Sequence, residues 1–208
     1  MRLLPLAAAL IGLALPAAPA AAQGFAVDVE AGWLEMTSAR ESAEAVFGSP
    51  GGAVFGGGVG YATDMGLFFR AGIRYAKREG ERVFALEDGG GVFPLGHPLE
   101  VRLLPVFGTV GYRFGALGPA TPYLGAGAGV TSYREESTVA GVTESLSRSG
   151  FSWRVLGGVE LLRGPVRLAA ELSWSSAPDL LGLGGVSELF GETDPGGLSV
   201  VGKVVFVP

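Results

Sequence analysis

The sequence predicts an all-β protein: an eight-stranded antiparallel up-and-down transmembrane β-barrel, preceded by a cleavable signal peptide. Three observations lead to this prediction. Apolar and polar residues alternate with a period of two in eight segments, and the connections between these segments are short and long in turn. After residue 22, no stretch approaches the roughly 18–20 uninterrupted apolar residues that a membrane-spanning helix needs. Such a chain is either soluble or crosses a membrane as a closed barrel.

Residues 1–22 have the pattern of a secretory signal peptide. Met1-Arg2 is followed by a Leu/Ala run, and small residues stand at Ala20 and Ala22. Pro16 breaks the run and no basic cluster follows it, which argues against a membrane-anchoring helix. We therefore expect cleavage before Gln23, with residues 23–208 forming the exported barrel domain.

The composition excludes several classes of function. The 208 residues include no cysteine and one histidine, and the formal net charge is −5. Disulfide frameworks, Cys-ligated zinc, iron–sulfur clusters, thiol catalysis and multi-histidine metal sites are ruled out. The negative charge argues against nucleic-acid binding. We expect no cofactor and no metal.

The alternating segments and their connections define the predicted topology. The segments are residues 25–33, 55–61, 67–75, 101–114, 124–130, 151–161, 166–174 and 198–206. Short turns are predicted at Thr63–Gly66, Gly115–Pro122 and Arg163–Pro165, and long connections at Thr37–Gly52, Arg78–Pro98, Arg134–Gly150 and Ser176–Gly196. Strict alternation of short and long connections is typical of a membrane barrel with two unlike rims.

Aromatic residues indicate which face of the strands meets lipid. They lie near strand ends and alternate in step with the apolar residues, so they belong to the same face, as a girdle at a bilayer boundary requires. The predicted girdle residues are Trp33, Tyr61, Tyr75, Tyr112, Trp153 and Trp174. A soluble, lipocalin-like barrel with its apolar face inward is the alternative.

The opposite face carries charges of both signs, which predicts ion pairs inside a narrow lumen. The candidates are Asp28, Glu30, Arg70, Arg74, Arg113, Arg154, Glu160, Arg167, Glu171 and Lys203. Glycines on the same face (Gly56, Gly58, Gly60, Gly72 and Gly158) would give the guanidinium groups room.

Two of the long connections have features of their own. Ser38-x-x-Glu41 resembles a capping box before a short helix that would end at Gly48, with an irregular loop as the alternative. The fourth connection is apolar around Leu180, Leu181 and Phe190, so it either folds over the barrel mouth or contacts a partner. The acidic residues of these connections either bind divalent cations or are simply solvated.

No motif predicts catalysis. Gly197 to Lys203 matches the spacing of a phosphate-binding loop, but no helix follows and Val204 replaces the required Ser or Thr. His97 could only act with a serine and an acid, such as Ser145, Ser147 and Glu144, and nothing in the sequence places them together. We expect a protein that is not an enzyme.

Two stretches resemble a known family. Thr121-Pro122-Tyr123-Leu124-Gly125-Ala126-Gly127-Ala128-Gly129-Val130 and Leu104-Pro105-Val106 with Gly111-Tyr112-Arg113-Phe114 are similar to strands of small bacterial outer-membrane β-barrel proteins of the OmpA, OmpX and OmpW kind. The resemblance implies a monomer in the outer membrane, in contact with lipids including lipopolysaccharide and with the barrel-assembly machinery. The family usually ends on an aromatic residue, whereas here Val207-Pro208 follow Phe206.

The sequence thus favours a structural role in the envelope, or surface interaction through the long extracellular loops. A narrow pore or transporter for small apolar solutes is the first alternative. An exported soluble binder and a lipid-modifying enzyme are the others.

Overall fold

The computed structural model describes residues 24–85, 91–139, 141–161, 164–182 and 186–208. The predicted signal peptide, residues 1–22, lies outside these ranges. Among the described residues, no helix is long and apolar enough to cross a membrane.

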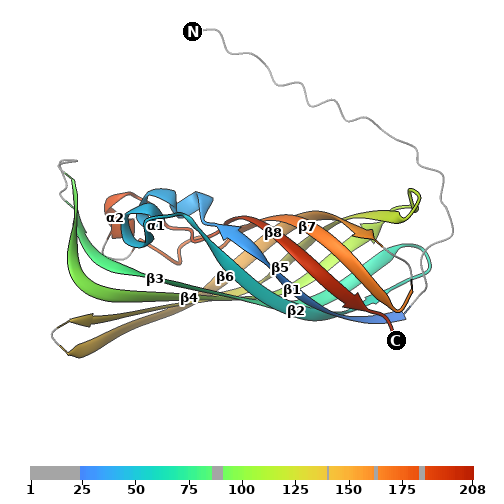
Figure 1. Ribbon diagram of the computed structural model, residues 1–208, viewed down its shortest axis with the longest axis horizontal. Coiled ribbons are helices and arrows are strands. Elements are labelled where there is room, and N and C mark those ends of the chain that lie inside the picture. Colours follow the sequence, from blue (N-terminus) through green and yellow to red (C-terminus); the bar gives the residue numbers. More distant parts are fainter. Residues whose placement is uncertain (1–23, 86–90, 140, 162–163, 183–185) are drawn as a thin grey trace, which may run out of the picture.

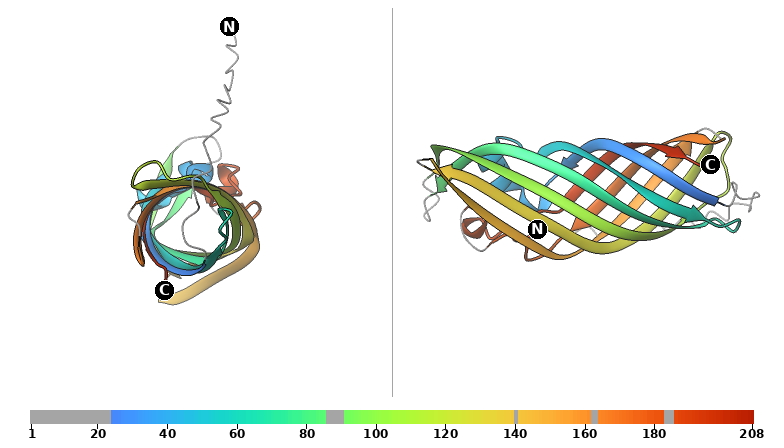
Figure 2. Two further views of the ribbon diagram at one scale, coloured as in Figure 1. Left: turned by 90° about the vertical axis from the view of Figure 1, so that its right-hand side faces the viewer. Right: turned by 90° about the horizontal axis from the view of Figure 1, so that it is seen from below.

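Eight antiparallel strands close into one barrel, as predicted (Figures 1 and 2). Each strand pairs with its neighbours in the sequence, and β1 pairs with β8 to close the ring. The strands are β1 (Gly24–Glu35), β2 (Gly51–Ala62), β3 (Leu67–Ala85), β4 (Val92–Arg113), β5 (Ala120–Val139), β6 (Val142–Leu161), β7 (Val166–Ser176) and β8 (Gly197–Phe206).

The strands are staggered strongly around the ring. Following paired residues from Gly32 through β2, β3, β4 and β5 leads to Arg148 on β6. Following them the other way, through β8 and β7, leads to Gly158, ten residues further along the same strand. This offset is the shear of the barrel, and it tilts the strands steeply against the barrel axis.

The second and third long connections, predicted as loops over Arg78–Pro98 and Arg134–Gly150, are mostly strand. β3 pairs with β4 as far as Ala85 and Val92, and β5 pairs with β6 as far as Val139 and Val142. The two hairpins project beyond the barrel at the end opposite the C-terminus (Figure 1). The prediction failed because the outward faces of these strands are polar rather than apolar, so the alternation that marks the membrane-spanning strands is absent.

The apolar face of the barrel points outward. Val27 and Ile73 are 50% and 46% exposed, whereas Arg74 and Glu171 are 5% and 2% exposed. An apolar exterior around a charged interior is the arrangement of a barrel in lipid. The lipocalin-like alternative, with apolar side chains inward, is therefore wrong.

The six aromatic residues predicted for the girdle fall at two heights once the tilt is taken into account. Trp33, Tyr75, Trp153 and Trp174 lie near the rim with the long connections, called the outer rim from here on. Tyr61 and Tyr112 lie near the rim with the short turns, the inner rim, where Tyr61 packs edge-on against Phe25 at 5.1 Å between ring centroids. The five residues other than Tyr61 are each at least 38% exposed.

Helices and a loop cover the outer rim. The 3-10 turn η1 (Thr37–Ala39) and helix α1 (Arg40–Phe47) follow β1, and α2 (Val186–Leu189) precedes β8. Leu180, in the connection between β7 and β8, is 3% exposed and packs into the apolar cluster beneath these helices. The fourth connection therefore folds over the mouth, one of the two alternatives the sequence left open.

The helix in the first connection forms as predicted, but the predicted cap is wrong. Ala39 precedes the helix and no side chain of the first connection caps it. The backbone amides of Glu41 and Ser42 instead donate to the carboxylate of Glu192, at 2.9 and 2.8 Å. A carboxylate at a helix N-terminus satisfies free amides and interacts favourably with the helix dipole. Glu192 thus ties the fourth connection to the first.

Replacing Glu192 by Ala should loosen this contact. We expect a loss of about 1 kcal/mol in local stability, since that is typical for removal of a helix cap. Amide hydrogen exchange of α1 should become faster while the thermal unfolding of the barrel stays unchanged. Glu188→Ala, in the neighbouring helix, is the control; equal exchange in the two variants would contradict the assignment.

The outward face of β5 offers a test of the membrane position. Ala126 lies between the two aromatic levels, and Ser132 lies beyond the outer level on the same face of the same strand. Arg at the bilayer midplane costs about 2–4 kcal/mol, against about 0–1 near the interface. Ala126→Arg should therefore lower the free energy of unfolding in lipid vesicles far more than Ser132→Arg. Equal losses would refute this placement.

Candidate functional site

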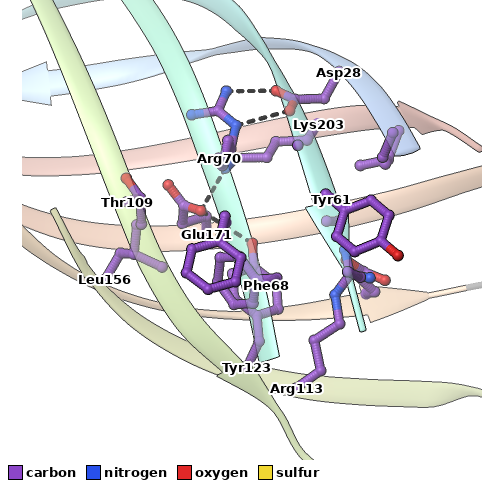
Figure 3. Close-up of a pocket in the computed structure, with 17 residues that line it drawn as sticks. Asp28, Tyr61, Phe68, Arg70, Thr109, Arg113, Tyr123, Leu156, Glu171 and Lys203 are labelled. Carbon is purple, nitrogen blue, oxygen red and sulfur yellow. Dashed lines mark hydrogen bonds and ion pairs between the residues drawn. The ribbon is translucent and has the colours of Figure 1, made fainter. Parts of the chain in front are cut away.

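The lumen is occupied by a network of buried charges. On the inner-rim side of this network, the Arg70 guanidinium binds the Asp28 carboxylate through two hydrogen bonds, of 2.7 Å from Nε and 2.5 Å from Nη2 (Figure 3). Such bidentate pairs fix geometry as well as charge. Arg70 Nη2 also lies 3.4 Å from Glu30, which links this pair to its neighbours.

Glu30 and Glu171 are joined by two cations. Arg74 donates from Nε to Glu30 at 2.6 Å and from Nη2 to Glu171 at 2.8 Å. Lys203 bridges the same two carboxylates from β8. Among the described residues, the central network thus contains three acids and three bases, drawn from β1, β3, β7 and β8, and its charges balance.

A second cluster of charges lies at the inner rim. Glu160 on β6 pairs with Arg113 at 2.7 Å and with Arg167 at 3.3 Å. The buried apolar residues Ala62, Phe68, Tyr123, Leu156 and Ala169 pack together beside it, and a cavity of about 50 Å³ touches both groups of charges. From this cluster the Tyr123 hydroxyl donates to Glu171 of the central network at 3.2 Å.

Of the ten residues predicted to form ion pairs in the lumen, Arg154 is the exception. It is 1% exposed and forms no salt bridge within the described residues, although the sequence suggested one. Its Nη2 donates to the Thr109 hydroxyl at 2.8 Å, and its guanidinium lies 4.8 Å from the centre of the Phe107 ring. A hydroxyl and an aromatic face therefore take the place of a carboxylate.

Glycine makes room for Arg70, as the sequence indicated. Gly58 and Gly72 are paired across β2 and β3, beside the Arg70 side chain. A Cβ at Gly58 would lie 2.9 Å from Arg70 Cζ and 2.5 Å from the Ala71 carbonyl oxygen. Any side chain there would displace the guanidinium that binds Asp28.

A second set of charges lies on the outside of the barrel, and the sequence analysis did not identify it. Paired residues across β3, β4 and β5 form a basic row, Lys77, Arg102 and Arg134, and, two residues further out, an acidic row, Glu79, Glu100 and Glu136. We call these two rows the outer charge ladder. The sequence does contain a sign of it: these charged residues continue the alternation of the lipid-facing residues, so they lie on the same face of each strand.

Ion pairs connect the two rows of the ladder. Lys77 lies 2.7 Å from both Glu79 and Glu100, and Arg134 lies 2.6 Å from Glu136. The hydrogen bond from Lys77, together with Arg102, holds the pKa of Glu100 below its usual range. Because like charges face each other within a row, pairing between rows is what makes the arrangement favourable.

Within the described residues, no hydrogen bond or ion pair joins the other candidates from the sequence into a site. His97 lies on the β3–β4 hairpin, whereas Ser145, Ser147 and Glu144 lie on β6. Lys203, from the phosphate-loop-like segment, is an ordinary member of the lumen network. Within the described ranges, no group of acidic or histidine side chains could hold a metal ion.

Comparison with known proteins places the chain in a family. The model of the outer membrane protein beta-barrel domain matches residues 6–162, more than half of the chain. The chain belongs to the outer-membrane β-barrel family. The family resemblance predicted from the sequence is thereby confirmed, and the protein is located in the outer membrane. No curated protein sequence matches it.

Solved structures share the fold at low sequence identity. A major outer membrane protein from Thermus thermophilus matches with a TM-score of 0.61 and 12% identity, over 89% of this chain and 98% of that one. Neisserial surface protein A matches with 0.54 and 16%, over 89% and 97%. The attachment invasion locus protein Ail of Yersinia pestis, in complex with a heparin analogue, matches with 0.50 and 11%, over 88% and 99%.

In this outer-membrane β-barrel, the ladder marks where the lipid-facing surface ends. On β3 the outward residues from Leu67 to Tyr75 are apolar or small, and the next, Lys77, is charged. A span of this length is close to the roughly 9–11 residues that a tilted strand needs to cross a bilayer. The hairpins beyond Lys77 therefore stand outside the membrane.

The lumen network should contribute strongly to stability. Glu30→Gln leaves Arg74, Arg70 and Lys203 with one carboxylate fewer, and breaking a buried ion pair typically costs about 3–5 kcal/mol. We expect a correspondingly lower free energy of unfolding in lipid vesicles. Glu79→Gln, in an exposed pair, should change it by less than about 1 kcal/mol. Similar effects of the two substitutions would argue against a structural role for the network.

Proposed function

We propose that this protein is a sealed outer-membrane anchor that presents two rigid β-hairpins outside the membrane for contact with a partner at the cell surface. The observation that supports the proposal most is the continuation of β3, β4, β5 and β6 beyond the outer charge ladder as paired strands. Paired strands hold their shape without a partner, so they can present a surface at little entropic cost.

The projecting β5–β6 hairpin has an open edge suited to recognition. β6 pairs with β7 only from Trp153 onward, so residues 142–152 have β5 on one side and no strand of the described chain on the other. A strand with unpaired amide and carbonyl groups is a template for an added strand. The partner we propose is therefore an extended segment of another protein.

The lumen argues against the pore alternative. Buried ion pairs from four strands meet across its centre, and apolar layers lie on both sides of them. The cavities beside the network measure only about 50 and 40 Å³. Passage of an apolar solute would require desolvated charges to separate, which costs several kcal/mol for each ion.

The ladder supports contact with anionic lipid. Its basic row lies just beyond the outer aromatic level, at the height of the headgroups, where lysine and arginine interact with phosphate. We include the anionic headgroups of the outer leaflet, such as those of lipopolysaccharide, among the partners. Because no hydrogen bond joins His97 to a serine of β6 within the described residues, we propose no enzymatic activity.

Two measurements test the proposal. The first is made in planar bilayers, where the purified protein should show no single-channel conductance; regular channel openings would favour the pore.

The second measurement uses a shortened protein. Residues 134–147 can be replaced by Asn-Gly, which joins Tyr133 to its paired residue Arg148 through a two-residue turn. The shortened protein should insert normally, and cells producing it should lose most of their retention on a surface layer of other cells.

The second measurement also separates surface contact from a general envelope role. Cells producing equal amounts of the wild type and the shortened protein should have the same permeability to a large antibiotic. Unchanged retention together with increased permeability would contradict surface contact and favour envelope integrity. Ser132→Ala, just below the shortened segment on β5, serves as a matched control.

A further inference from the structure

We infer that the outer mouth holds a binding site for a small uncharged molecule with an apolar body and one hydroxyl or carbonyl group. This goes beyond surface contact by the projecting strands and does not depend on it. The site is a cavity of about 390 Å³ between α1, α2 and the inward faces of the two hairpins. A volume of this size is within the range of small-molecule pockets in proteins.

The cavity has an apolar body that is formed before any ligand binds. α1 supplies Ala43 and Phe47 on one side, and β4 and β5 supply Leu99, Val101 and Tyr133 on the other. Apart from Phe47, each of these side chains is at most 7% exposed. The apolar side of the cavity favours contact with a hydrocarbon or aromatic group over water.

A single polar atom points to the ligand's chemistry. Ser137, on the inward face of β5, lines the cavity and is 6% exposed, and its hydroxyl has no hydrogen-bond partner in the described part of the chain. A buried hydroxyl without a partner costs free energy, and a ligand hydroxyl or carbonyl would remove that cost. The neighbouring Tyr133 hydroxyl is already used, because it donates to Glu135 at 2.6 Å.

Charge excludes an anionic ligand. The charged groups that line the cavity are Arg82, Glu135 and Glu144, so their net charge is negative. Arg82 and Glu144 pair with each other at 3.2 Å, and both are largely exposed, at 45% and 67% of their side chains. This pair marks the opening, where a neutral molecule can pass without replacing a salt bridge.

The test uses the full-length mature protein in lipid nanodiscs, with 4-(trifluoromethyl)benzyl alcohol as the probe and fluorine NMR as the readout. Empty nanodiscs give the signal from partitioning into lipid. We expect saturable binding to the wild type above that background. The carboxylate analogue, 4-(trifluoromethyl)benzoate, should show none.

Two substitutions at one position locate the site. Ser137→Ala keeps the cavity and removes the hydroxyl, so the dissociation constant for the alcohol should rise about five- to tenfold, as expected for one hydrogen bond. Ser137→Phe fills the cavity and should abolish binding. Ser132→Ala, on the outward face of the same strand, should bind like the wild type. Heat-modifiable mobility on gels shows that each variant is folded.

The inference is overturned if the wild type shows no saturable binding, if Ser137→Ala binds as tightly as the wild type, or if the benzoate binds as well as the alcohol. Because Ser137→Ala preserves shape, its result stands even if Ser137→Phe does not fold. Surface retention of cells producing Ser137→Ala should be unchanged, so a failure of this inference leaves the proposed surface contact intact.

Discussion

The pairing of β1 with β8 is the interaction on which the rest of the structure depends. In hydrocarbon, every backbone amide and carbonyl must find a partner within the protein, and a sheet can meet this requirement only by closing on itself. Closure requires a fixed stagger, which here amounts to ten residues around eight strands. The stagger in turn determines which inward side chains meet at each height of the lumen.

The charged lumen follows from that closure. An eight-stranded barrel has an interior that side chains can fill, and the outward face is committed to lipid, so the inward face carries the polar residues. In the central network the charges balance and each ion has a partner of opposite sign, and glycines on β2 and β3 leave space for Arg70. Buried ion pairs of this kind are costly to break singly, which makes the network a strong determinant of register.

The sequence predicted the barrel and its faces because a period of two along one strand needs no knowledge of other strands. It predicted that Arg70, Arg74 and Glu171 face inward, but it could not predict that Arg74 bridges Glu30 to Glu171, since such contacts depend on stagger. The cap on α1 escaped prediction for a similar reason: Glu192 is remote in sequence from the amides it accepts. The hairpins were mistaken for loops because their outward faces are polar rather than apolar.

The outer charge ladder occupies only one side of the barrel. It lies on β3, β4 and β5, whereas the outward residues of β7, from Val166 to Trp174, carry no charge. If the barrel moved deeper into the bilayer, the charges on β3, β4 and β5 would have to enter hydrocarbon, which costs free energy. The uncharged outward face of β7 would have no such cost. Movement of the barrel along the bilayer normal is therefore coupled to a change in its tilt. The molecule should rest at an inclined angle to the bilayer normal and lean the same way in every copy.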